Sequence, residues 1–204
     1  MAFDTYANLQ TAIGNFLARD DLATQIPDFI SLAEARMSRE LDTRSQEKRA
    51  VGATIVGEEF ISLPTDLREV RLVKINTNPV SVLDFMTPNT FYTTYNSTGN
   101  GTPKAYSIIG TEIALRPTPD SVVDVEIMYG ESIASLSNTQ TTNTVLTRHP
   151  DAYLYGSLSA AYTYLMDEAR SLQYDSMFTR IMAEIIKDTD TARFGGGALA
   201  MKTS

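Results

Sequence analysis

The single histidine and the acidic residues are the side chains of this chain that could act in catalysis, so their spacing matters first. His149 is the only histidine among 204 residues. It precedes Pro150 at an expected helix start, where a histidine serves as a capping or surface residue. A catalytic triad needs its histidine beside a nucleophile and an acid, and the sequence contains no Gly-x-Ser-x-Gly turn. We therefore predict no catalytic role for His149.

Two pairs of adjacent acids raise the possibility of a glycosidase. Asp20-Asp21 and Glu58-Glu59 are neighbours in the sequence, whereas glycoside hydrolysis needs two carboxyl groups roughly 5–9.5 Å apart across one cleft. Neighbouring acids in loops are more typical of solvated turns. The chain also has no cysteine, which excludes disulfides, thiolate metal sites and cysteine nucleophiles. We predict no catalytic, cofactor-binding or metal site.

Aromatic side chains could instead bind a partner or a sugar. Tyrosines 153, 155, 162 and 164 fall in one helical segment, where aromatic residues usually fill a helix interface. Phe91, Tyr92 and Tyr95 lie in the polar stretch "PNTFYTTYNSTGNGTP", which we predict to be a loop. Loop residues are free to meet partners, so these three are candidates for contact with another protein or a neighbouring subunit.

The C-terminal segment "ARFGGGALAMKTS" combines three glycines and two cations with the apolar Leu199 and Met201 after the glycines. The glycines predict a flexible connection, after which the apolar residues could dock on a partner. A frayed terminus without a role is the alternative. The candidate arm residues are Arg193, Phe194, Gly195, Gly196, Gly197, Leu199, Met201 and Lys202.

Helical periodicity marks both ends of the chain. At the N-terminal end, two segments carry apolar residues at spacings of three and four, which predicts two amphipathic helices that form a hairpin. Asp4 or Thr5 can cap the first helix, and Glu34, Arg36, Arg39 and Glu40 are expected to point outward from the second. The two apolar stripes comprise Tyr6, Leu9, Ile13, Phe16 and Leu17, and then Ile26, Phe29, Ile30, Ala33, Met37 and Leu41.

Near the C-terminal end, Pro150 suits the first turn of a third helix, and a break near Ser171 precedes a fourth. The stripe of the third helix comprises Leu154, Leu158, Ala161, Tyr162 and Leu165. The stripe of the fourth comprises Phe178, Ile181, Met182, Ile185 and Ile186.

Between the helix pairs the apolar period changes to two. "KAYSIIGTEIALRP" predicts a hairpin that turns at Gly110-Thr111. "SVVDVEIMYG" alternates between an apolar face with Val125 and Ile127 and a polar face with Asp124 and Glu126. This alternation is typical of antiparallel strands with one wet face. The stretch "SLSNTQTTNT" reads as a polar linker back to the helices.

These segments predict an α+β fold, because helices and strands are segregated along the chain. Isolated amphipathic helices of this length are marginal in water, so we expect the two terminal pairs to pack as one four-helix bundle. The predicted division is a helical domain of residues 1–44 and 146–191, an inserted antiparallel β module of residues 45–145, and a flexible arm of residues 192–204.

Net charge limits the partners. The chain carries a net charge of −8 at pH 7, and two of its cations, Arg193 and Lys202, lie in the terminal segment. Such an acidic body repels a phosphate backbone and argues against a dedicated nucleic-acid binder. It is compatible with a wall along which DNA slides without sticking. No apolar run approaches the roughly 18 residues that a membrane helix needs, and the N-terminus does not look like a signal peptide.

Four blocks, taken in order, resemble a known family. They are "RDDLATQIPDFISLAEARMSREL", "LPTDLREV", "GTPKAYSIIGTEIALRPTPD" and "TNTVLTRHPDAYLYGSLSAAYTYLMDEAR". The ordered set resembles the head-to-tail adaptor proteins, also called head-completion or connector proteins, of short-tailed phages. The resemblance runs from about Thr5 to about Arg193 and involves no catalytic motif.

The resemblance implies a structural protein of the virion neck that assembles in the host cytoplasm. Such adaptors form a ring, typically a dodecamer, beneath the portal protein. The ring extends the channel for double-stranded DNA and provides the attachment surface for the tail nozzle, and C-terminal extensions reach along the portal. The terminal arm would then be a portal-docking segment. A nozzle or other tail subunit, a tail-associated cell-wall hydrolase and a glycan-binding module remain the alternatives.

Overall fold

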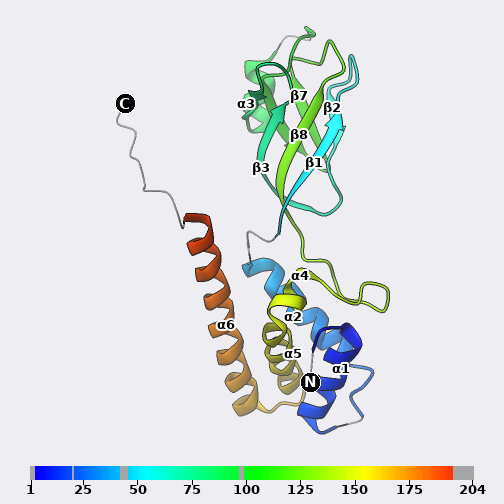
Figure 1. The fold of residues 1–204 in the computed structure, drawn as a ribbon, viewed down its shortest axis with the longest axis vertical. Coiled ribbons are helices and arrows are strands. Elements are labelled where there is room, and N and C mark those ends of the chain that lie inside the picture. Colours follow the sequence, from blue (N-terminus) through cyan, green and yellow to red (C-terminus); the bar gives the residue numbers. More distant parts are fainter. Residues whose placement is uncertain (1–2, 20, 42–45, 97–98, 195–204) are drawn as a thin grey trace. The chain divides into compact units, whose positions relative to one another are not determined.

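The computed structural model describes residues 3–19, 21–41, 46–96 and 99–194 (Figure 1). The chain forms two compact units, which we call the helical unit (Met1–Gln46 with Ile133–Ser204) and the β unit (Glu47–Ser132). Among the described residues there are six helices and two four-stranded sheets. The predicted α+β class is therefore confirmed.

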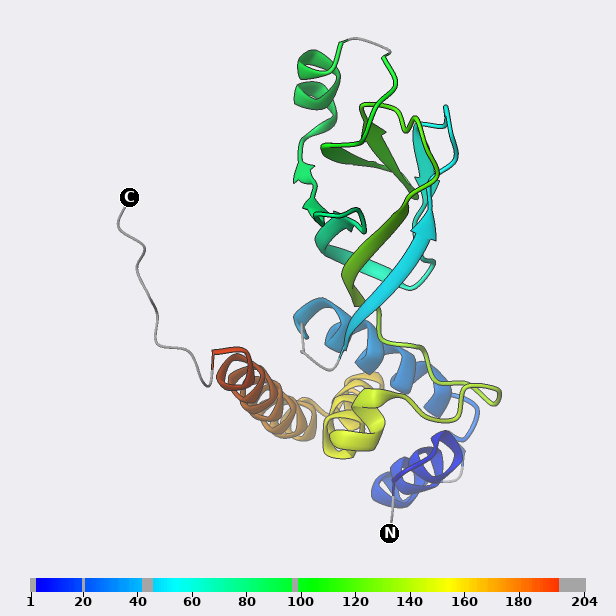
Figure 2. The same cartoon turned by 45° about the horizontal axis from the view of Figure 1, so that its top comes forward.

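The helical unit is built around its central helix. α1 (Tyr6–Leu17), α2 (Ile26–Glu40) and α6 (Glu168–Phe194) each pack against α5 (Pro150–Tyr164), and the short α4 (Thr144–Arg148) precedes α5 (Figures 1 and 2). One apolar core takes residues from both ends of the chain, including Leu9, Ile30 and Leu158. The N- and C-terminal helices thus bury their stripes in one shared core, since isolated amphipathic helices of this length are marginal in water.

Capping explains where these helices begin. The Thr5 hydroxyl accepts a hydrogen bond of 3.3 Å from the Asn8 N–H at the start of α1. Pro150 occupies the first turn of α5, as predicted. The Asp167 carboxylate accepts from the Arg170 N–H at 3.1 Å and caps α6. The break between the last two helices therefore lies at residues 165–167, before the expected position near Ser171.

Three residues in the predicted helices face a different way from the prediction. Phe16 and Ile186 lie at the edges of their stripes and are exposed, at 48% and 39% of their surfaces. Glu34 was expected to point outward, but only 6% of its surface is exposed. Its carboxylate is buried because it bonds the segment that returns from the β unit, which periodicity alone does not reveal.

Gly156 allows three helices to meet. A Cβ atom at this position would lie 2.9 Å from the Phe178 ring on α6 and 3.0 Å from the Ala33 Cβ on α2. Contacts that short are not tolerated, so the absent side chain lets α2, α5 and α6 approach one another. Phe178 is fully buried as a result.

The β unit holds two sheets of four strands with one core between them. One sheet has the order β1 (Glu47–Ala53), β8 (Asp124–Glu131), β3 (Leu67–Ile75) and β4 (Ser81–Val82). The other has the order β2 (Phe60–Ser62), β7 (Glu112–Arg116), β6 (Ala105–Ile109) and β5 (Asp84–Phe85). All pairs are antiparallel except β5 with β6, which is parallel.

The predicted hairpin and the alternating strand are confirmed. β6 and β7 pair Tyr106 with Leu115 and Ile108 with Ile113, and Gly110 in the turn has a φ of 63°, which favours glycine. On β8, Val125 and Ile127 are buried in the core. Glu126 on the opposite face is also buried, because Lys74 at 3.1 Å and Arg49 at 3.7 Å cover and neutralise it.

Residues 133–145 belong to the helical unit, whereas the sequence placed them in the β module. Leu136 and Val145 are buried in the helical core, so this polar stretch packs against the helices. At the other end, α6 runs through Phe194, past the expected start of the arm at residue 192. The sequence between residues 168 and 194 contains no glycine or proline, so nothing ends the helix earlier.

Candidate interaction surfaces

The residues considered for catalysis lie in structural positions. His149 immediately precedes α5, and partial burial lowers the pKa of its imidazole. Glu59 accepts a hydrogen bond of 2.5 Å from Arg116, whose side chain is nearly buried. Within the described residues, no three His, Asp or Glu side chains gather closely enough to hold a metal ion. Asp20 lies outside the described residues.

The predicted contact loop contains a helix, α3 (Pro88–Thr94). Phe91 is fully buried against Ala105 and Ala114, so its side chain is not available to a partner. Phe91 was misassigned because one apolar residue in a polar stretch gives no periodic signal.

The two tyrosines of this stretch support the same small cluster. The Arg116 guanidinium lies 5.7 Å from the centre of the Tyr92 ring, and burial together with Glu59 raises the pKa of the Tyr92 hydroxyl. The Tyr95 ring lies 6.2 Å from the Phe91 ring. Tyr92 keeps an exposed edge, so a partner contact through Tyr92 and Tyr95 stays a prediction.

The predicted arm is only partly described. Arg193 and Phe194 lie in the last turn of α6. The remaining arm residues lie outside the described residues: Gly195, Gly196, Gly197, Leu199, Met201 and Lys202. Docking by this arm is therefore treated below as a proposal.

α6 is held to the other helices by charged and aromatic contacts. From α2, Arg36 pairs with Asp175, donates to Thr179 at 3.2 Å and lies 4.6 Å above the Phe178 ring. On the α5 side, the Tyr174 ring stacks on Tyr162 with centroids 5.4 Å apart. These contacts fix the first half of α6.

A buried polar network fastens the segment that enters the helical unit from the β unit. The Glu34 carboxylate accepts hydrogen bonds from the Leu136 N–H at 2.8 Å and from the Tyr153 hydroxyl at 3.1 Å. Asn143 donates to the Tyr153 hydroxyl at 2.6 Å and accepts from the Leu146 N–H at 2.8 Å. Burial raises the pKa of Glu34 above its usual range.

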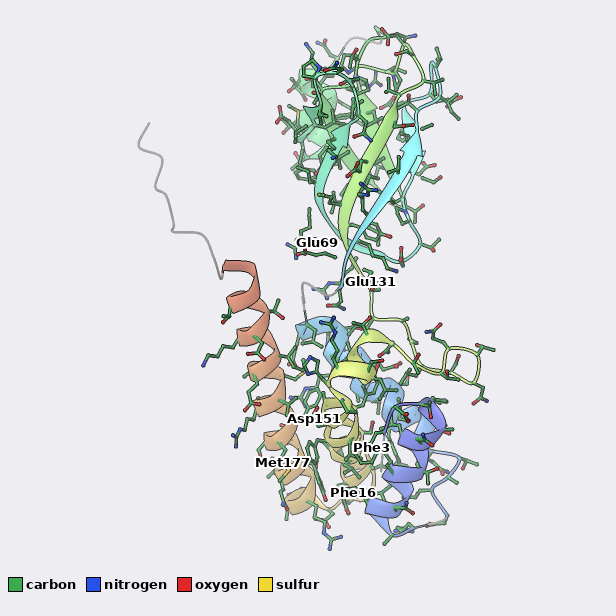
Figure 3. The ribbon with its side chains drawn as sticks, in the orientation of Figure 1. Phe3, Phe16, Glu69, Glu131, Asp151 and Met177 are labelled. Atoms are coloured by element: carbon green, nitrogen blue, oxygen red, sulfur yellow. The ribbon has the colours of Figure 1, made fainter. Side chains whose placement is uncertain are left out.

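In the β unit, Lys48 on β1 links the end of β8 to the turn before β3. Its ammonium pairs with Glu131 and, at 3.0 Å, with Asp66, and Figure 3 shows Glu131 at the end of β8. The Tyr129 hydroxyl donates to the same Asp66 at 2.9 Å. These partners raise the pKa of Lys48 and lower that of Asp66, so the cluster is charged and structural.

Large apolar side chains are nevertheless exposed in each unit. In the β unit, Ile55, Val56 and Val122 are exposed on two loops, which are joined by the hydrogen bond from the Gly57 N–H to the Pro119 carbonyl. In the helical unit, Met166 is 90% exposed and Leu172 is 70% exposed, both near the start of α6. Apolar surface of this kind marks contacts with other proteins when it is grouped.

None of the described helices combines the length and the apolar character needed to cross a membrane.

The comparison with protein families agrees with the order of the sequence blocks. The family described as SU10 adaptor protein matches residues 4–201. The chain belongs to this adaptor family. The resemblance to phage head-to-tail adaptors is therefore confirmed, and the adaptor is a structural phage protein. No curated protein matches the chain at a significant level.

Periodicity did not single out the apolar residues that the adaptor exposes. Met166 falls within the third predicted helix, which was expected to run to a break near Ser171, and Val122 falls at the start of a predicted strand. Neither position was therefore expected to be exposed. A signal for the first was present, because Asp167 followed by Glu168 is a typical helix start. With the helix start placed there, Met166 becomes a linker residue without a core to enter.

Proposed function

We propose that this adaptor assembles as a ring, with about twelve copies, beneath the portal protein of a filled phage head. In that position the ring extends the DNA channel and offers the tail nozzle its attachment surface. The observation that carries the proposal is the family match over residues 4–201. Its place in the virion is the neck, and assembly takes place in the host cytoplasm.

The physical properties of the chain support this role. A net charge of −8 gives a conduit that DNA passes without binding, since attraction at many sites would slow its passage. The shared core of α1, α2, α5 and α6 supports a four-helix bundle that acts as one body in the ring. The exposed apolar residues of both units supply surfaces for neighbours, portal and tail.

The terminal arm has a defined purpose in this proposal. Burying Leu199 and Met201 would contribute about 1.5–3 kcal/mol each, whereas ordering a residue's backbone costs about 1–2 kcal/mol. One arm therefore binds weakly. Arms on a closed ring act together, and the effective concentration raises avidity by roughly 10²–10⁴.

Native mass spectrometry of the full chain with the portal protein of its own phage tests the proposal. We expect the free chain to be a monomer and the portal complex to contain a fixed number of copies in a closed ring. A chain that stays solitary beside the portal, but binds a purified nozzle, would make it a tail subunit and overturn the proposal.

A further inference from the structure

Met166 is unfavourable for the isolated chain in two independent ways. It has a φ of 57° and follows α5, with its N–H bonded to the Thr163 carbonyl and the Asp167 N–H bonded to the Tyr162 carbonyl. In this helix-ending motif the left-handed residue is usually glycine, because a side chain strains the backbone there. The side chain is also 90% exposed. A strained position that holds an apolar side chain in water contributes nothing to folding.

Two further residues continue the surface around Met166. Leu172 is 70% exposed, and it lines a shallow pocket together with Met166, Thr163 and Glu168. Glu168 stands at the N-terminus of α6, while the neighbouring Asp167 is paired with Arg170 at 3.6 Å. We call Met166, Glu168 and Leu172 the α5–α6 knob. It is apolar with one acidic side chain.

A groove with an apolar floor residue and a cationic rim lies between α1 and the start of α2. It is lined by Gly14, Asn15, Arg19, Ala23 and Ile26, among others. A Cβ atom on Gly14 would meet only the Ile26 side chain, at 3.7 Å, so the floor is open at Gly14 and apolar at Ile26. Gln10, Thr11 and Asn15 contribute polar side chains to the rest of the lining. The groove measures about 370 Å³, and an enclosed cavity of about 150 Å³ already holds benzene. There is room for a methionine side chain.

Arg19 gives this groove a positive rim. Asp21 accepts hydrogen bonds from its Nε at 2.9 Å and its Nη2 at 2.6 Å. A guanidinium has five donors, and among the described residues Asp21 is the one that bonds to Arg19. Within the described part of the chain, the donors of Nη1 remain for a second carboxylate.

The knob lies at the junction of α5 and α6, and the groove lies between α1 and the start of α2. Both views place α6 on one side of α5 and α1 on the other (Figures 1 and 2), and α5 contacts both. They are also at the same end of the unit, because Arg19 is close enough to Tyr164, the last residue of α5, to interact with it electrostatically. Surfaces arranged in this way can meet between copies related by a rotation.

We propose that the α5–α6 knob of one copy docks into the α1–α2 groove of a second copy of this chain. Met166 lies over the floor at Gly14 and Ile26, and Glu168 faces Arg19. Because every copy carries both surfaces, the contact is heterologous and closes into a ring when the rotation allows. The inference rests on the proposed function, for which the ring is the working assembly.

A stable interface buries about 1,200–2,000 Å² in total. The knob offers only three side chains, so this contact alone would not hold two copies together. The knob therefore sets the spacing and register of copies that the portal already holds. Its effect is to be measured in the portal complex with the full-length chain.

Met166→Gly separates the proposed contact from folding. Glycine relieves the left-handed backbone, so we expect a melting temperature higher by about 2–4 °C. Loss of the buried side chain should raise the chain concentration for half-maximal ring formation at least about tenfold. Ala18→Gly is the matched control, because Ala18 is exposed and also ends a helix with a positive φ of 50°. It should raise the melting temperature and leave ring formation unchanged.

A cysteine pair tests which surfaces meet. The chain has no native cysteine, so Met166→Cys combined with Asn15→Cys should give a ladder of linked copies under mild oxidation of the portal complex. Each single variant should give no ladder.

The outcomes distinguish this contact from the proposed function. If wild-type chains form the ring on the portal while Met166→Gly assembles normally, or the cysteine pair gives no ladder, the contact is wrong and the function stands. Linkage of Met166→Cys to a portal protein with an introduced cysteine would assign the knob to the portal and also overturn the contact. If wild-type chains do not bind the portal, the function is wrong, and the cysteine pair then decides the contact on concentrated free chain.

Discussion

Two single residues, which periodicity does not single out, are important for the packing of the helical unit. Gly156 lets α2 and α6 approach α5, and Glu34 bonds the segment that returns from the β unit. The role of each residue depends on neighbours that are distant in the sequence but close in the folded chain. Their contributions can be measured one at a time.

Gly156→Ala should destabilise the chain by about 1–3 kcal/mol, because the added Cβ would lie 2.9 Å from the Phe178 ring and force the helices apart. Urea unfolding followed by circular dichroism measures the change. Gly14→Ala is the matched control, since its Cβ would make an ordinary contact of 3.7 Å and the exchange within a helix should stabilise by about 0.5–1 kcal/mol. Equal effects of the two substitutions would contradict the close approach at Gly156.

Glu34 should make stability depend on pH. Burial raises the pKa of its carboxyl in the folded chain, so the unfolded chain ionises first as pH rises. Stability is then lost from the ordinary pKa upward until the raised pKa is passed. Glu34→Gln cannot ionise, and it should gain stability relative to the wild type as pH rises through that window.

Urea unfolding measures the difference in unfolding free energy between Glu34→Gln and the wild type. Measurements between pH 4 and 8, about one unit apart, sample the whole window. Glu184→Gln, an exposed change on α6, controls for the loss of one carboxylate. A constant difference between Glu34→Gln and the wild type at every pH would show that Glu34 is not held in a raised-pKa environment.

At the scale of elements, the structure separates what periodicity predicts from what it does not. The stripes of α2 and α5 and the β6–β7 hairpin follow from spacing, because burial on one face selects those residues. α3, the start of α6 and the site of Glu34 do not. α3 depends on one anchoring residue, Phe91, and the start of α6 depends on the cap at Asp167. The burial of Glu34 depends on its hydrogen bond to Leu136, which is more than a hundred positions away in the sequence.

The surfaces could be predicted even less well than the elements. Phe91 was a candidate contact and is core, whereas Met166 was overlooked and is exposed. Burial of an apolar residue can be expected from the sequence. Which apolar residues stay exposed depends on how the helices pack together. The family role, in contrast, follows from the order of four blocks along the chain.

α3 is anchored through one residue, and substitution can show it. Phe91→Ala should destabilise the β unit by about 3–5 kcal/mol, because its ring is fully buried against Ala105 and Ala114. Tyr92→Ala, next to it and partly exposed, should cost markedly less. Thermal unfolding of both variants measures this. A larger loss for Tyr92→Ala would mean that the Arg116 cluster, rather than Phe91, holds the helix.

At the scale of the whole molecule, the arm and the helices are expected to act separately. Because α6 continues through Phe194, a truncation that tests the arm should remove residues 195–204 and keep the helix. We expect an unchanged melting temperature and a portal affinity at least about tenfold weaker, measured by native mass spectrometry. A large fall in melting temperature would show that the segment belongs to the core.

The claim on which the account depends is that helices from both ends of the chain form one cooperative core. Native-state hydrogen exchange of the free chain tests it most directly, since it reports the opening free energy of each helix. We predict that the most protected amides of α2 and of α5 open with the same free energy and lose the same amount in Gly156→Ala. Protection of α2 that is much lower, and unchanged by that substitution, would contradict the shared core.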